Sequence, residues 1–235
     1  MNKTMLLAAT AVLALTWTGA ADAGRPAPSV TGSKAKHFAH APVNRALQVL
    51  WDQNGTDSGI GIVSQNFESS FDAYDAEAAD DFTVPANTRW TIKEVDVTGV
   101  YFNGSGPASS VTVRFYGHVK GKPEKRNIPG PLRYELTNVV PQQDNFGSFV
   151  VTLPSNVSFR SGSHWVSVQA NLDFLAGGEW GWENQVEVVG WPAVWRNAGG
   201  GFGVCSDWGQ ENVCIPDGQG DHMFTLRGVS HDLSP

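Results

Sequence analysis

Residues Val111-Thr112-Val113-Arg114-Phe115-Tyr116 decide the fold class, because apolar and polar side chains alternate along them. The aliphatic and phenylalanine side chains stand at the odd positions, and threonine, arginine and tyrosine stand at the even positions. Successive side chains of a β-strand point to opposite faces of the sheet, so this pattern is typical of an antiparallel strand with one buried face. We therefore expect a half-buried strand here.

The same alternation recurs along the chain. It is found over residues 149–153, 166–170, 180–188 and 224–227, and it places Trp180, Trp182, Val186 and Val188 on an apolar face. Between residues 89 and 101 the apolar phase shifts, which predicts a β-bulge near Lys93 or Glu94. About ten short strands without intervening helices predict an all-β protein, an antiparallel β-sandwich of the jelly-roll type.

Composition agrees with this fold and excludes some functions. The 235 residues include 26 Gly and 13 Pro, which fit the turns between strands. The net charge is −7, and the chain has no long basic run, so we do not expect nucleic acid as a partner.

The first 23 residues are typical of a secretory signal peptide. Lys3 precedes an apolar run from Met5 to Trp17, and Ala21-Asp22-Ala23 forms a small-x-small cleavage site. The apolar run is too short to span a bilayer. We expect a secreted or periplasmic protein without a membrane span, with a flexible leader over 24–50 that includes one short helix at 44–50, and a single domain over 51–235.

Because we expect the protein to be exported, we also expect its two cysteines to meet an oxidising compartment. In an oxidising compartment Cys205 and Cys214 are expected to form a disulfide that closes one loop. The chain-entropy model assigns such a closure about 2.7 kcal/mol. Residues 120–131 hold three prolines and four Lys or Arg residues, and are expected to form an exposed connection.

Three segments carry a resemblance to known proteins. They are Ala78-Ala79-Asp80-Asp81-Phe82-Thr83-Val84-Pro85, the pair Trp90-Thr91-Ile92 and Val95-Asp96-Val97-Thr98-Gly99, and Asp221-His222-Met223-Phe224-Thr225-Leu226-Arg227-Gly228. Together they resemble the jelly-roll β-sandwich modules of secreted bacterial proteins, most of which have no assigned activity. The resemblance implies a role in adhesion, in glycan binding or as an accessory to exported hydrolases.

A catalytic site is not evident. The chain has neither a Gly-x-Ser-x-Gly elbow nor a His-Glu-x-x-His helix. Glu179 and Glu183 could be the paired acids of a glycosidase, but their spacing along one strand, roughly 13 Å, exceeds the usual separation of such acids. We interpret them as solvated acids on a strand face.

An acidic run between Asp72 and Asp81 admits a structural calcium ion. If the first and last strands pair, Asp221 comes close to Asp80 and Asp81, and these three are the predicted ligands. A solvated turn is the alternative.

Tryptophan suggests where a ligand binds. Trp165 shares a strand face with Gln169 and Asn171, so an exposed ring flanked by amides could stack on a sugar and bond its hydroxyls. Three further candidates, Trp191, Trp195 and Trp208, lie in Gly- and Pro-rich connections. The alternative is that these rings pack down as lids on the sandwich.

These observations predict a secreted, non-catalytic module that binds a polysaccharide or a cell-surface glycan. One alternative is a protein-interaction or adhesion module that is accessory to exported hydrolases and has a secreted protein as partner. A second alternative is a hydrolase with an unrecognised site.

Overall fold

The computed structural model describes residues 27–33, 47–119 and 127–235. The predicted signal peptide, most of the predicted leader and residues 120–126 of the predicted connection lie outside these residues. The described part is all-β, with two antiparallel sheets packed as a sandwich, as the alternation predicted. Its helices are short: η1 (Ser69–Tyr74), α1 (Phe174–Gly177) and α2 (Glu211–Cys214).

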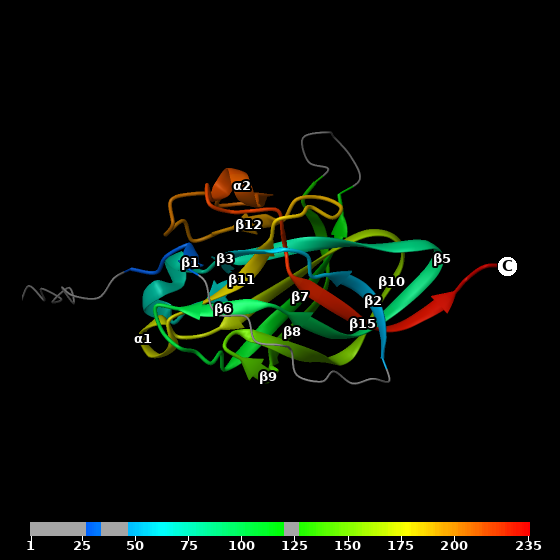
Figure 1. Cartoon of the computed structure of the whole chain (residues 1–235), viewed down its shortest axis with the longest axis horizontal. Helices are drawn as coiled ribbons and strands as arrows, with labels where there is room; N and C mark the ends of the chain where they lie inside the picture. Colours follow the sequence, from blue (N-terminus) through cyan, green and yellow to red (C-terminus); the bar gives the residue numbers. More distant parts are fainter. Residues whose placement is uncertain (1–26, 34–46, 120–126) are drawn as a thin grey trace, which may run out of the picture.

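The larger sheet is built on two long strands, β5 (Glu77–Val97) and β10 (Ser148–Asn171), which pair along most of their lengths. They extend toward the end of the molecule where the C-terminus lies, while β1 and α1 lie at the opposite end (Figure 1). Beside them lie β2 (Gln48–Gln53), β4 (Gln65–Asn66), β7 (Ser110–His118), β8 (Pro129–Val139), β9 (Gln142–Asn145), β12 (Val194–Arg196), β13 (Gly209–Gln210) and β15 (Phe224–Asp232).

The smaller sheet is centred on β11 (Glu179–Gln185), which pairs with β3 (Asp57–Val63), β6 (Gly99–Phe102) and β14 (Asp221–His222). Strand β1 (Thr31–Ser33) pairs with the outer edge of β3. One part of the segment expected to be a leader is therefore a sheet edge.

The predicted faces and the predicted bulge are confirmed. Val111, Val113 and Phe115 on β7 are fully buried between the sheets. On β5, the register with β15 shifts between Glu94 and Ile92, so Lys93 is the extra residue. The apolar phase changes at this position because the bulge turns the following side chains to the other face.

Two secondary-structure predictions are wrong, and the described residues contain more strands than expected. Trp180 and Trp182 are buried as predicted, but Val186 and Val188 are 55% and 51% exposed because β11 ends at Gln185. Residues 48–50 belong to strand β2 and not to a helix, and residues 44–46 lie outside the described part. The described residues contain fifteen strands and not about ten, since seven strands have only two to four residues and are too short to show a periodic pattern.

The predicted disulfide is confirmed, with the Cα atoms of Cys205 and Cys214 5.6 Å apart. It closes the loop that carries Trp208 and holds it near β12 and β13. Within the described ranges no helix has the length and apolar character needed to cross a membrane.

Candidate functional site

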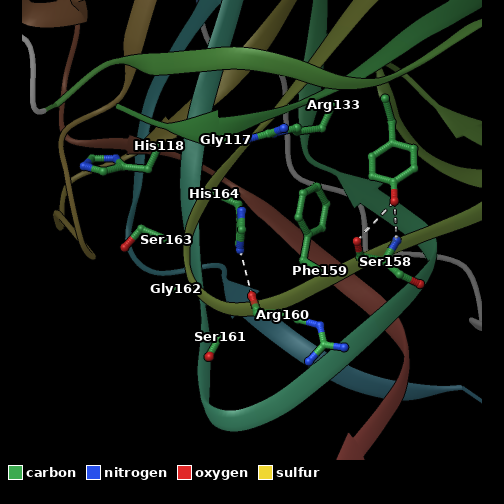
Figure 2. Close-up of a pocket in the computed structure, with 11 residues that line it drawn as sticks. Gly117, His118, Arg133, Ser158, Phe159, Arg160, Ser161, Gly162, Ser163 and His164 are labelled. Atoms are coloured by element: carbon green, nitrogen blue, oxygen red, sulfur yellow. Dashed lines mark hydrogen bonds between the residues drawn. The ribbon is translucent and has the colours of Figure 1, made fainter. Parts of the chain in front are cut away.

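A pocket of about 680 Å³ lies where the end of β7 and the middle of β8 meet the middle of β10. Among the described residues, its walls come from these three strands (Figure 2). The lining residues are Gly117, His118, Arg133, Tyr134, Ser158, Phe159, Arg160, Ser161, Gly162, Ser163 and His164. Aromatic rings and cationic or hydroxyl groups therefore share one cavity.

His164 forms part of the pocket wall and is held in one orientation. Its Nε2 donates a hydrogen bond of 2.9 Å to the carbonyl oxygen of Arg160, and its ring packs 4.3 Å from the ring of Phe159 (Figure 2). Burial lowers the pKa of His164, and the positive charges of Arg133 and His118 lower it further. The neutral ring that results carries a lone pair on Nδ1, which has no hydrogen-bond partner among the described residues.

The pocket is cationic although the chain is acidic. Arg133 and Arg160 are both exposed and both line the cavity. The guanidinium of Arg133 lies across Gly117, where a Cβ would stand only 3.2 Å from Nε, so the absence of a side chain makes room for the arginine. None of the described residues that line the pocket is acidic.

Three nearly parallel rings, Trp165, His118 and Trp191, adjoin the pocket, and we call them the ring trio. The ring of His118 lies 6.4 Å from that of Trp165 and 6.0 Å from that of Trp191, at angles of 7° and 12°. Trp165 Nε1 also donates a hydrogen bond to His118 Nδ1. Trp191 is 37% exposed, so the trio presents an aromatic surface to solvent beside the cavity.

The expected exposure of Trp165 is wrong, since the side chain is completely buried. Its face of the sheet was predicted correctly, but that face is covered by a second small core of Ala79, Tyr116, Trp165 and Val194. Val194 comes from β12, which pairs with the edge of β5, and the partly buried side chains of Ile128 and Trp208 pack against this core. Trp165 can support a ligand site only through His118.

The amides predicted to flank an exposed Trp165 are used inside the fold. Gln169 is buried, accepts a hydrogen bond from Arg114 and donates one to the carbonyl of Ala76. Asn171 donates to the hydroxyl of Ser110. Neither amide lines the cationic pocket.

Trp195 and Trp208 also lie away from this pocket. Trp195 belongs to β12 and not to a loop, is completely buried, and donates from Nε1 to the carbonyl of Val63. Trp208 is partly buried, and the guanidinium of Arg196 lies 4.4 Å above its ring. The lid alternative thus describes Trp208, which packs against the second core, whereas Trp195 belongs to the main core. Trp191 is the candidate that adjoins the pocket, through its contact with His118.

Asp80, Asp81 and Asp221, the predicted calcium ligands, do come together, and we call them the carboxylate cluster. Asp80 lies on β5 and accepts hydrogen bonds from the backbone N–H of Asp81 and of His222, and from the side chain of Gln53. Asp81 Oδ1 accepts the N–H of Trp191 at 2.7 Å, whereas its Oδ2 is buried without a partner among the described residues.

Asp221 holds the same loop from the other side. It accepts the backbone N–H groups of Val189 and Ala193. Gly190, at φ +91°, passes so close to Asp81 that a Cβ would stand 2.5 Å from a carboxylate oxygen. The cluster therefore fixes the backbone of residues 189–193, and with it the position of Trp191.

Burial raises the pKa of all three carboxyl groups. The pKa of Asp81 is raised to about 7 and that of Asp221 to about 6, and the pKa of Asp80 is raised well above its usual value by burial and by its two acidic neighbours. Within the described ranges no group of three or more His, Cys, Asp or Glu residues is arranged to hold a metal ion. Backbone N–H donors stabilise the ionised carboxylates and lower their pKa values, but burial outweighs this effect.

Glu179 and Glu183 are not solvated acids, because both are buried on β11. Glu179 accepts a hydrogen bond of 2.6 Å from Asn103, and burial raises its pKa to about 7. A strand in the middle of a sheet can have both faces covered, which its alternation does not reveal.

Arg133, Arg160 and His164 were not predicted as site residues. No local motif joins them, since they reach the pocket from β8 and from two positions of β10. The one available signal is the hydroxyl- and glycine-rich composition of Arg160-Ser161-Gly162-Ser163, which is typical of a turn but lies inside β10.

Comparison of the chain with protein families, with curated proteins and with solved structures yields no match. Its function is therefore inferred from the geometry of the site.

Proposed function

We propose that the protein is a secreted, non-catalytic β-sandwich module that binds a carbohydrate polymer or a cell-surface glycan at the cationic pocket. The observation that carries the proposal is the ring trio, whose exposed member Trp191 stands beside a pocket lined by hydroxyl, imidazole and guanidinium groups. An aromatic face covers the C–H face of a sugar, while polar groups nearby bond its hydroxyls.

The compartment fits this function. A disulfide between Cys205 and Cys214 is typical of a chain that folds outside the cytoplasm. The resemblance of Ala78–Pro85 and Asp221–Gly228 to jelly-roll modules of secreted bacterial proteins also supports an extracellular binding or accessory role.

One observation favours a protein partner as the second candidate. Val186, Val188, Val189 and Trp191 are all exposed in the segment that follows β11. Apolar and aromatic side chains gathered on one loop are a feature of protein contact surfaces. The partner would then be a secreted protein, in the adhesion or accessory role.

Retention on a panel of insoluble polysaccharides tests the first candidate. We expect the wild-type protein to be retained on at least one of them and Trp191→Ala to lose most of this retention, because the variant removes the exposed stacking surface. Trp208→Ala is the matched control, since this partly buried tryptophan lies outside the pocket. Thermal unfolding checks that both variants are folded.

Retention on no polysaccharide, or equal retention of wild type and Trp191→Ala, contradicts glycan binding at this site. Capture of one defined secreted protein by the wild type but not by Trp191→Ala would then favour the second candidate.

A further inference from the structure

We infer that the saccharide bound at this pocket is anionic, carrying a carboxylate or sulfate group that pairs with Arg133 and Arg160. The inference rests on the proposed function and adds the chemical class of the ligand. It is drawn from the charge and the unused hydrogen-bonding capacity of the lining residues.

The first argument is the local charge. Two guanidinium groups and two imidazoles line the cavity, and no acidic side chain lines it among the described residues. Neither Arg133 nor Arg160 forms an ion pair with a carboxylate within the described ranges. This contrasts with two arginines at a neighbouring pocket: Arg114 pairs with Glu135 and Glu77, and Arg196 pairs with Glu77.

The second argument is the geometry of the donor groups. A guanidinium offers parallel N–H donors that match the two oxygens of a carboxylate or sulfate. Arg133 passes over Gly117, where the absence of a side chain leaves room for its guanidinium beside the cavity. Arg160 approaches from the β10 side of the cavity (Figure 2).

Acceptor atoms also lie beside these donors. A bare anion offers only acceptor atoms, whereas a sugar also carries hydroxyl groups that donate. The hydroxyls of Ser161 and Ser163 line the pocket and can accept from such a group or donate to it. Donors for an anionic group and acceptors for hydroxyls together match an acidic sugar better than a free anion.

The test compares two ligands that differ only in charge, tetragalacturonate and its fully methyl-esterified form, by titration calorimetry at low salt. We expect the wild-type protein to bind the acid about tenfold or more tightly than the ester, as one charge-assisted contact warrants. Arg133→Gln and Arg160→Gln should each remove most of this preference. Lys93→Gln, which makes the same change of charge at the β5 bulge outside the pocket, should keep it.

Each other outcome has a defined meaning. Equal binding of acid and ester overturns the anionic class but leaves glycan binding intact. If sodium sulfate binds as tightly as tetragalacturonate, the pocket is a simple anion site, and the inference that it binds a saccharide is overturned. An unchanged preference in both arginine variants places the anionic contact elsewhere and also overturns the inference. If neither ligand binds and no polysaccharide retains the protein, the proposed function itself fails.

Discussion

The carboxylate cluster and the cationic pocket lie on two sides of the same tryptophan and use their charged groups in opposite ways. Asp81 accepts the backbone N–H of Trp191, and His118 lies parallel to the Trp191 ring. The cluster is buried and accepts most of its hydrogen bonds from backbone N–H groups, whereas Arg133 and Arg160 are exposed and form no ion pair among the described residues. The comparison separates charges that build the loop from charges that can bind a ligand.

The largest expected effect is on stability, in Asp80→Ala. This change leaves three donors, from Gln53, Asp81 and His222, without their acceptor inside the fold. Each unsatisfied buried group costs about 1–3 kcal/mol, so we expect the free energy of unfolding to fall by about 3–5 kcal/mol in urea titrations.

Asp80→Asn is the control for this variant, because its amide oxygen still accepts while the negative charge is lost. We expect it to be much less destabilised than Asp80→Ala. If Asp80→Ala lowers the free energy of unfolding by less than about 1 kcal/mol, the carboxylate cluster does not stabilise the fold as we expect.

The next effect is a dependence of stability on pH. The pKa of Asp81 is about 7 in the folded protein, against 3.8 for an ordinary aspartate. The folded state therefore binds more protons than the unfolded state between these values, so stability is fully present near pH 4 and falls as the pH rises to 7. At about 1.4 kcal/mol per pKa unit, the decrease from this group is on the order of 2–4 kcal/mol.

Asp81→Asn should flatten this profile when the midpoint of thermal unfolding is measured from pH 4 to pH 8. A slope contributed by Asp80 and Asp221 should remain, since the pKa of each is also raised. Asp173→Asn, at an exposed site away from the cluster, should leave the profile unchanged. An identical profile for Asp81→Asn and wild type would show that Asp81 does not titrate in this range.

The smallest expected effect on stability is in the pocket. Arg160 is exposed, so Arg160→Gln should change the free energy of unfolding by no more than about 0.5 kcal/mol. A loss above about 2 kcal/mol in urea titrations would assign this arginine to the fold and would remove the distinction between the two regions.

The structural features that could be predicted from the sequence are those that depend on neighbouring residues along a strand. Alternation located the buried face of β7 and the bulge at Lys93, because both follow from side chains two positions apart. The pairing of distant segments was also predicted for the cluster, since Asp221 lies close to Asp80 and Asp81.

The predictions that were wrong are those of exposure, because the exposure of a strand face depends on which other segment covers it. The face of Trp165 was predicted correctly, but alternation cannot show that Ile128 and Trp208, from other segments, pack against the small core on that face. Glu179 and Glu183 were misassigned for the same reason. Arg133 and His164 could not be joined from the sequence, because the walls of the pocket come from strands that are distant along the chain.

The contrast between the acidic chain and its cationic pocket has a consequence for association kinetics. With a net charge of −7, the molecule repels an approaching polyanion over a Debye length of about 30 Å at 0.01 M salt. At 0.1 M salt this length falls to about 10 Å, which screens the distant repulsion, while the contacts with Arg133 and Arg160 act at short range. The rate of capture of an anionic chain should therefore rise with salt before it falls.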